Sequence, residues 1–248
     1  MEAVETSSLY LNEDVEAWQN ALAAYGDVLQ LKANNNGKAK RDRDLVALDK
    51  WYQDELPQNL KSRDKMYLNL DELCQLMKWK LTRGKFRPRL SDLVKANDGE
   101  TVEKISLKAF ECLPDVSSAV RELSKLKAVG PATASAILSA GAPNLVPFMA
   151  DEAMMAIPNL GEINYNLPFY MKFVERIDEV LQRLKKKDPN GNWTAHKIEL
   201  ALWTEVMAKK YDFHLSQGAH TNGCNNGVDS RKRKSAEAPK GKKRAKKK

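Results

Sequence analysis

Cysteine is scarce in this sequence and long apolar runs are absent. The three cysteines, Cys74, Cys112 and Cys224, lie far apart. They form neither a disulfide framework nor a metal-binding cluster, so we expect a reducing compartment, no zinc or iron–sulfur site and no cofactor. No stretch reaches the roughly 18 apolar residues that a membrane span needs, and the first residues are acidic, unlike a secretory signal. We therefore expect a cytosolic or nuclear protein without membrane contact.

Excess basic charge is missing from most of the chain. The net charge is +8, but residues 231–248 contain 11 Lys/Arg and one Glu. That segment carries +10, which leaves residues 1–230 with a net charge of −2. Any interaction with nucleic acid therefore depends on this tail and on local basic patches rather than on overall charge.

No segment shows the alternation of apolar and polar residues that indicates a β-strand. Apolar residues recur instead at the three-and-four spacing of a helix. Asp14 is a candidate N-cap for the first helix, whose apolar face is Val15, Trp18, Leu22, Tyr25 and Leu29. An asparagine run ends this helix at residues 34–36, and Pro57 ends the next. The later helices are expected at residues 43–55, 90–96, 101–112, 116–123, 170–184 and 194–210, and a further helix begins at residue 70. Asp115 is the candidate N-cap of the helix at 116–123. Ile198, Leu202 and Val206 form the apolar face of the helix at 194–210.

We predict an all-α fold of about ten helices in two lobes. The helical core covers residues 13–216. One lobe comprises residues 41–139, and the other combines residues 13–33 with 141–216. Residues 217–248 lack the apolar content that would offset the entropy cost of ordering, so we expect a disordered basic tail.

A basic segment, KWKLTRGKFRPR, occupies residues 78–89. Gly84 and Pro88 interrupt regular structure, which predicts a loop. Basic residues alternate there with Trp79 and Phe86, and this pattern indicates contact with phosphates. The alternative is a solvated basic turn whose two aromatic rings point into the core. The candidate nucleic-acid ligands in this segment are Lys80, Arg83, Lys85, Arg87 and Arg89.

A helix, a tight turn and a second helix are predicted within residues 123–141. Val129 and Gly130 form the turn, and Pro131 has the fixed φ that suits a first helical residue. The free N–H groups of Ala132 and Thr133 would attract a phosphate at the helix N-terminus. The alternative is an ordinary turn between packed helices. The candidate ligands here are Lys127, Val129, Gly130, Ala132 and Thr133.

Residues 126–134, LKAVGPATA, resemble the Leu-Pro-Gly-Val-Gly-x-x-Thr-Ala hairpin of the helix-hairpin-helix DNA glycosylases, the endonuclease III-like superfamily. That family has an aspartate about twenty residues beyond the hairpin, and Asp151 occupies the matching place. By the same analogy, residues 78–89 correspond to a loop that approaches DNA, and a late amphipathic helix falls at residues 195–207. The specific similarity covers about thirty residues, and the longer pattern is similar to that of a group of divergent eukaryotic proteins.

The sequence departs from this family at two hairpin positions. Ala128 replaces the first hairpin glycine, so the turn is less permissive. Ala132 stands where bifunctional members place a Schiff-base lysine, so the resemblance implies no lyase chemistry through that residue. The cysteine quartet of the iron–sulfur module is missing as well. The resemblance therefore implies a monofunctional glycosylase, or a binding protein that has lost the chemistry.

Asp151 is the candidate catalytic residue. By the family analogy its carboxylate would stabilise an oxocarbenium-like sugar and position water, after the target base is flipped out of the duplex. Alternatively, Asp151 is only the N-cap of a short helix at residues 152–157. His196 has no obvious partner and is expected to be a packed helix residue rather than a base.

The basic tail is a candidate nuclear localisation signal. We therefore expect a monomeric nuclear protein that binds nucleic acid, double-stranded DNA above all, and an importin-type receptor. A non-catalytic DNA-binding or chromatin-binding module is the alternative, and a purely structural helical domain is the third. The signal residues are Arg231, Lys232, Arg233, Lys234, Lys242, Lys243 and Arg244.

Overall fold

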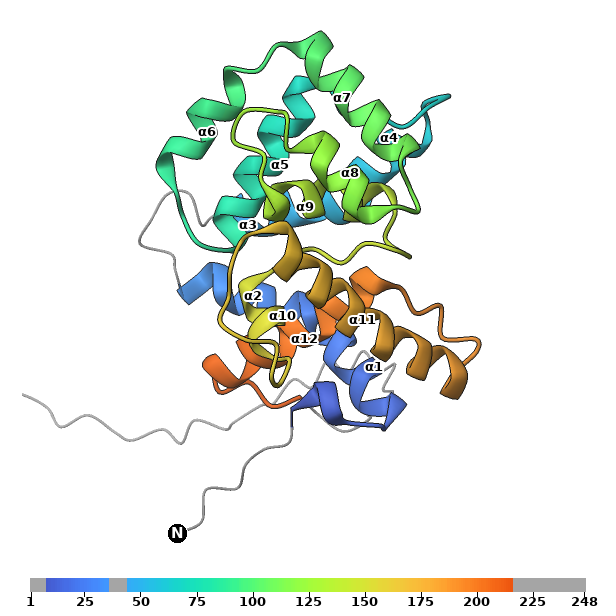
Figure 1. Ribbon diagram of the computed structural model, residues 1–248. Coiled ribbons are helices and arrows are strands. Elements are labelled where there is room, and N and C mark those ends of the chain that lie inside the picture. Colours follow the sequence, from blue (N-terminus) through green and yellow to red (C-terminus); the bar gives the residue numbers. More distant parts are fainter. Residues whose placement is uncertain (1–7, 36–43, 216–248) are drawn as a thin grey trace, which may run out of the picture. The chain divides into compact units, whose positions relative to one another are not determined.

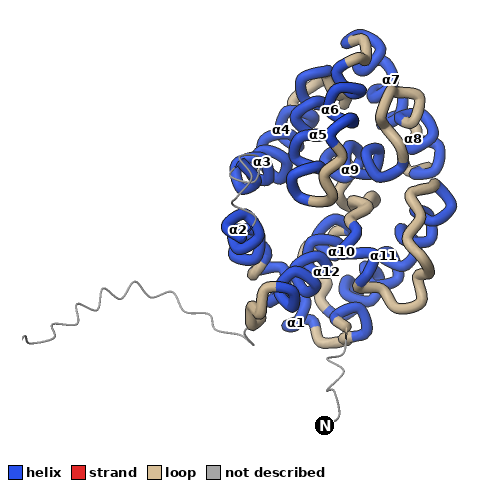
Figure 2. The backbone as a smooth tube through the Cα atoms, turned by 90° about the vertical axis from the view of Figure 1, so that its left-hand side faces the viewer, coloured by secondary structure: helices blue, strands red, loops and turns tan. Residues whose placement is uncertain are grey.

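The structure is a computed structural model, shown in Figure 1, that describes residues 8–35 and 44–215. All regular elements in these two ranges are helices, which confirms the all-α prediction (Figure 2). The predicted tail at residues 217–248 lies outside the described residues. In chain order the elements are η1 (Leu9–Leu11), α1 (Val15–Ala23), α2 (Tyr25–Asn35), α3 (Leu45–Lys50), the π-helical turn η3 (Trp51–Glu55), α4 (Leu56–Lys61), α5 (Leu70–Arg83), α6 (Pro88–Lys95), α7 (Gly99–Glu111), α8 (Val116–Leu123), α9 (Pro131–Gly141), α10 (Asp151–Met155), α11 (Leu167–Lys187) and α12 (Ala195–Lys210).

The first predicted helix is broken into two. The cap at Asp14 is confirmed, because its Oδ1 accepts the N–H of Glu16 at 3.0 Å. α1 ends at Ala23, however, and α2 begins at Tyr25, so the predicted apolar face belongs to two separate helices. Both helices pack against α12, and two short helices follow that surface where one straight helix was predicted.

The prediction that Pro57 ends the next helix was wrong. Helical structure runs without interruption from Leu45 to Lys61 through the π turn. The N–H of Leu56 donates to the carbonyl of Trp51, five residues earlier. After this wider turn, Pro57 lies in the first turn of α4, where its missing N–H costs no hydrogen bond.

The basic segment at residues 78–89 is mostly helical, so the prediction of a loop was wrong over most of its length. A capping box formed by Asn69 and Glu72 begins α5, and the helix continues through Arg83 before Gly84 ends it. Pro88 then begins α6, as its fixed φ allows. Only residues 84–87 form the connection, and the basic side chains consequently point in several directions.

α12 is surrounded by other helices rather than lying at the surface. It packs against α1, α2, α10 and α11. Ile198 and Leu202 are buried as predicted, but Glu199 and Trp203 on other faces are fully buried too, and Val206 is partly exposed. The amphipathic prediction for this helix was therefore wrong, because neighbouring helices cover it on nearly every side.

The candidate site lies where two groups of helices approach each other. In Figure 1, helices α3 to α9 gather in the upper half, and α1, α2 and α10 to α12 gather in the lower half. Contacts place all the described residues in one compact unit, and the division into two lobes stays a prediction. None of the described helices is both long enough and apolar enough to cross a lipid bilayer.

Candidate functional site

The connection between α8 and α9 spans residues 124–130, and its last turn lies at Lys127 and Ala128, where the N–H of Val129 donates to the carbonyl of Leu126 at 3.2 Å, two residues before the predicted position. Ala128 has φ 64°, in the left-handed region that favours glycine. Gly130 precedes Pro131 in an extended conformation, with φ −100° and ψ −175°. A Cβ built on Gly130 would meet nothing within 4 Å. The strained position is therefore Ala128, and the fold itself does not require a glycine at position 130.

The start of α9 offers fewer free donors than predicted. The N–H of Thr133 donates to the carbonyl of Gly130 at 3.0 Å, a bond that tightens the first helical turn. The prediction of a free N–H was wrong for this residue. The N–H of Ala132 has no acceptor among the described residues, so it is the donor that the turn presents.

Two other turn residues anchor the backbone. Val129 is buried in the core, so its side chain cannot contact a ligand. The N–H of Lys127 donates to Oδ1 of Asn97 at 2.8 Å, and its Nζ donates to the carbonyl of Ala96 at 2.8 Å. These bonds fix the turn to the end of α6, and they hold the exposed Lys127 ammonium group against the carbonyl of Ala96.

Arg83 is not a surface ligand, contrary to the prediction. Its side chain is 1% exposed, and Nη2 lies 3.0 Å from Oε1 of Glu199. Although burial alone would lower the pKa of Arg83, the Glu199 carboxylate holds it above its ordinary value. The guanidinium also lies within 6 Å of four aromatic ring centroids, those of Tyr25, Trp79, Phe148 and Trp203. The residue therefore serves the core that supports the site.

The two aromatic residues of the basic segment have different environments. Trp79 is fully buried; its ring stacks on Tyr52 at 3.5 Å between centroids, and its Nε1 donates to Asp49 at 2.8 Å. Phe86 is 50% exposed. The alternative interpretation, in which both aromatic rings point into the core, is therefore confirmed for Trp79 and wrong for Phe86. Phe86 lies at the surface beside Lys85 and Arg87.

A pocket of about 300 Å³ brings together three segments that the sequence analysis singled out separately. The basic segment contributes Lys80, Lys85 and Arg87, the turn contributes Gly130 to Thr133, and the third segment contributes Asp151. Arg89 is exposed on α6 and does not line this pocket. The full lining is Lys80, Arg83, Gly84, Lys85, Arg87, Leu90, Ala128, Gly130, Pro131, Ala132, Thr133, Phe148, Met149, Ala150, Asp151, Glu152 and Tyr165.

Asp151 is the first residue of α10 and not its cap. Ala150 occupies the cap position, and no side chain caps this helix. The carboxylate instead accepts the hydroxyl of Tyr165 at 2.7 Å on Oδ1 and lies 3.0 Å from Nζ of Lys85 on Oδ2. The interpretation of Asp151 as a simple helix cap was therefore wrong. With 15% of its side chain exposed, Asp151 presents a carboxylate on the pocket wall.

The charges around Asp151 act on one another. The Asp151 carboxylate raises the pKa of the Lys85 ammonium group. Burial raises the pKa of Tyr165, and its hydrogen bond to Asp151 raises it further. Burial lowers the pKa of Lys80 to about 8, helped by the positive charge of Arg87 and opposed by Asp151. The pocket lining thus holds two neighbouring carboxylates, Asp151 and Glu152, among several cations.

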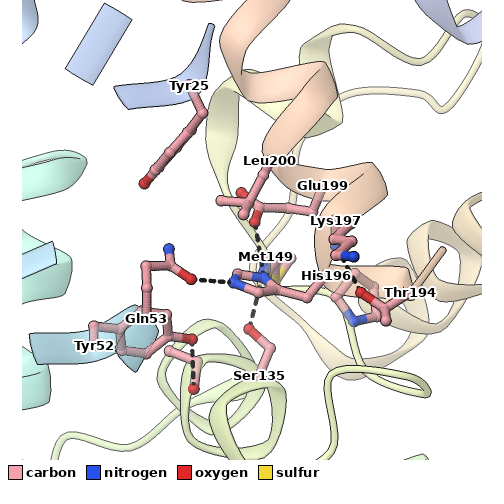
Figure 3. A network of polar contacts seen from close by, with 12 residues as sticks. Tyr25, Tyr52, Gln53, Ser135, Met149, Thr194, His196, Lys197, Glu199 and Leu200 are labelled. Carbon is pink, nitrogen blue, oxygen red and sulfur yellow. Dashed lines mark hydrogen bonds and ion pairs between the residues drawn. The ribbon is translucent and has the colours of Figure 1, made fainter. Parts of the chain in front are cut away.

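A buried polar network supports the segment that leads to Asp151 (Figure 3). Oγ of Ser135, on α9, accepts the N–H of Met149 at 2.9 Å. The hydroxyl of Tyr170, on α11, donates to the carbonyl of Pro147 at 3.0 Å. The approach to α10 is therefore fixed from two helices.

His196 lies in the same buried region. Its Nε2 lies 2.8 Å from Oε1 of Gln53, and its Nδ1 lies 3.2 Å from Oε2 of Glu199 (Figure 3). His196 is a packed helix residue, as predicted, but the expectation that it lacks a partner was wrong. It joins the Arg83–Glu199 ion pair to the π turn and is not one of the residues that line the pocket.

Sequence reasoning missed Tyr165. It follows no helical periodicity, and the bonds that define its role come from the fold: its hydroxyl holds Asp151, and the Arg87 guanidinium lies 5.7 Å from its ring centroid. An exposed aromatic residue in a loop beside the candidate aspartate was the signal available. Tyr165 therefore belongs to the site.

A second cavity, of about 500 Å³, lies among α3, α5 and α6. Lys78 is the one residue of the basic segment in its lining, and its Nζ pairs with Asp44 at 2.9 Å. None of the candidate ligands and none of the candidate catalytic residues lines this second cavity. The candidate site is therefore the first pocket.

The sequence of this chain matches no family model, no curated protein and no solved structure.

Proposed function

We propose that this protein binds duplex DNA on the face that carries the 300 Å³ pocket, and that the pocket receives one base rotated out of the helix. The observation that carries the proposal is the pocket lining, which joins the basic segment, the α8–α9 turn and Asp151. The basic segment was selected for its charge, the turn for its free backbone donors and Asp151 for its place in the family resemblance, and all three contribute to one pocket lining. Together they supply cations, a backbone donor and a carboxylate.

The pocket has the size and charge that this role needs. A volume of about 300 Å³ is at the lower end of the range for ligand pockets, which suits one base rather than a larger molecule. Lys85 and Arg87 are exposed and cationic, so they are available to phosphates on either side of a flipped nucleotide. The open space at Gly130 allows a phosphate to approach the N–H of Ala132.

The proposed reaction is hydrolysis of an N-glycosidic bond. As the base departs, positive charge develops on the sugar, and a carboxylate at Asp151 stabilises it and orients a water molecule. Tyr165 fixes the orientation of that carboxylate through its 2.7 Å hydrogen bond. In this scheme the α8–α9 turn acts as a helix-hairpin-helix that binds the DNA backbone, and the two groups of helices act as the two lobes of a glycosylase-like fold.

A non-catalytic DNA-binding protein is the second candidate, and one observation favours it. Both oxygens of Asp151 already have partners, Lys85 and Tyr165. If Lys85 keeps this position on DNA, the carboxylate is neutralised and cannot stabilise a cationic sugar. The glycosylase therefore requires that a phosphate draws Lys85 away from Asp151.

A base-release assay separates the two functions. Duplexes that each contain one common damaged base are incubated with the full chain, and free base is measured. Wild-type protein should release at least one base, whereas Asp151→Asn should release none and bind the same duplex with similar affinity. Asp178→Asn, at an exposed aspartate on α11, is the matched control and should behave as wild type. Absence of release from every duplex, with tight binding retained, would establish the binding protein instead.

The tail lies outside the described residues. We propose that it acts as a nuclear localisation signal and adds non-specific affinity for DNA. The 11 Lys/Arg of residues 231–248 would release counterions from DNA and steepen the dependence of affinity on salt. Truncation after Asn226 should flatten that dependence and abolish nuclear import. An unchanged slope and unchanged import would reject both roles.

A further inference from the structure

Lys80 is a lysine inside the pocket that has no partner. It lies on α5, is half-buried and lines the pocket. Among the described residues, nothing forms a hydrogen bond or an ion pair with its Nζ. The sequence predicted a phosphate ligand at this position, but a half-buried amine within a pocket is poorly placed for a phosphate that runs along the outer surface.

The surroundings of Lys80 favour its neutral form. Burial lowers the pKa of Lys80 to about 8, and the charge of Arg87 contributes to that shift. An appreciable fraction of the amine is therefore unprotonated at neutral pH, unlike an exposed lysine with a pKa near 10.4. Desolvation and a neighbouring cation are the conditions that make a lysine a nucleophile toward carbonyl carbon.

We propose that Lys80 forms an imine with an aldehyde, and that this aldehyde is the open-chain sugar of an abasic site in duplex DNA. The inference rests on the proposed function, because release of a base in this pocket leaves that sugar beside Asp151 and Lys80. An activity on abasic sites was not expected from the sequence, since Ala132 cannot supply an amine. The structure supplies one from α5.

The step needs no further reactant. The lone pair of the neutral Nζ attacks the aldehyde carbon C1′, and the carbonyl electrons move to oxygen. That oxygen takes one proton from the amine and one from solvent and leaves as water, so that C1′ and Nζ are joined by a protonated double bond. The chain thereby holds the abasic product covalently until water reverses the reaction.

Reductive trapping tests the inference on the full chain. Sodium cyanoborohydride converts the imine into a stable secondary amine, which joins protein and DNA irreversibly. Three probes are compared: a duplex with one abasic site, the same duplex with a tetrahydrofuran residue that has no aldehyde, and free 2-deoxyribose 5-phosphate. We expect a stable adduct on the first, none on the second and at most a weak one on the third, with peptide mapping locating the adduct on Lys80.

The variant Lys80→Arg keeps a cation but removes the nucleophile. It should reduce trapping at least tenfold, whereas Lys172→Arg, at an exposed lysine on α11, should trap as well as wild type. The trapping rate of wild type should rise with pH and level off just above pH 8. A surface lysine as the nucleophile would instead give a rate that keeps rising toward pH 10.

Four results would overturn the inference: an adduct that maps to tail lysines, undiminished trapping by Lys80→Arg, equal trapping of the free sugar, or no trapping by wild type. Affinity for the tetrahydrofuran duplex, measured in parallel, distinguishes this failure from failure of the proposed function. Tight binding without trapping rejects only the role of Lys80. Absence of binding to any duplex rejects the proposed function and this inference together.

Discussion

Nζ of Lys85 lies 3.0 Å from Oδ2 of Asp151, and the two side chains differ sharply in exposure, at 69% and 15%. The lysine belongs to the short connection between α5 and α6, and the aspartate begins α10. An exposed cation thus spans from a surface loop to a carboxylate on the pocket wall. Under the proposed function a phosphate would compete for the same ammonium group, so binding of DNA would free the carboxylate.

Replacing Lys85 should affect DNA binding more than stability. Exposed ion pairs contribute little, so Lys85→Ala should change the free energy of unfolding by less than about 1 kcal/mol. Loss of one phosphate contact should reduce the slope of log K against log salt by about 0.9, which fluorescence anisotropy at several salt concentrations can measure. Lys65→Ala is the matched control, because Lys65 is also 69% exposed and pairs with Glu111. Identical slopes for the two variants would show that Lys85 does not contact a DNA phosphate.

Gly130 should matter for binding and not for folding. A Cβ at this position meets nothing within 4 Å, so Gly130→Val should shift the free energy of unfolding by less than about 1 kcal/mol. A side chain there obstructs the approach of a phosphate to the N–H of Ala132, and loss of one such hydrogen bond should weaken duplex binding about tenfold. Gly99→Val, also at an open position but outside the pocket, should bind normally. A large loss of stability without loss of affinity would contradict the assignment.

Phe86 should help to hold a flipped base out of the duplex. Its side chain is 50% exposed between two pocket residues, and apolar side chains inserted between base steps stabilise unstacked DNA. With a fluorescent base analogue at the target position, Phe86→Ala should show less of the fluorescence increase that accompanies unstacking. Leu93→Ala, at a leucine that is 49% exposed on α6, should match wild type. Equal fluorescence for all three proteins would exclude this role.

Lys80 should make stability depend on pH in a specific window. Its folded pKa is about 8, whereas the unfolded value is near 10.4. Between these values the unfolded chain binds more protons, so the free energy of unfolding should rise with pH. Lys80→Met removes this contribution and should be roughly 1–3 kcal/mol more stable than wild type at pH 7, with the gap closing toward pH 10.5. Urea unfolding at a series of pH values measures it, and a constant gap would contradict the folded pKa.

Local signals in the sequence were sufficient for much of the fold. The caps at Asp14 and Asp115 are confirmed by hydrogen bonds to backbone two or three residues away. Gly84 and Pro88 end and begin helices as their backbone properties require. The start of α9 at Pro131 was predictable for the same reason, since the fixed φ of proline suits a first helical residue.

Interactions between distant segments were not predictable. Arg83 looks like its basic neighbours in sequence, but its partner Glu199 lies 116 residues away, and only the packed fold decides that this arginine is buried. Likewise the role of Tyr165 depends on where α10 begins, and the π turn that admits Pro57 depends on a change of hydrogen-bond register. Sequence identified the segments of the site, and packing selected which side chains face the pocket.

The most direct test of the account is hydrogen–deuterium exchange of the full chain with and without duplex DNA. We predict slower amide exchange on binding in three segments, residues 84–90, 128–134 and 148–152, each of which contributes residues to the lining of the 300 Å³ pocket. Residues 71–78 and 91–95, which supply most of the lining of the second cavity, should exchange at the same rate in both samples. Protection that is confined to the basic tail, or that falls on the second cavity while the pocket segments stay unchanged, would contradict the proposal that this pocket is where the protein meets DNA.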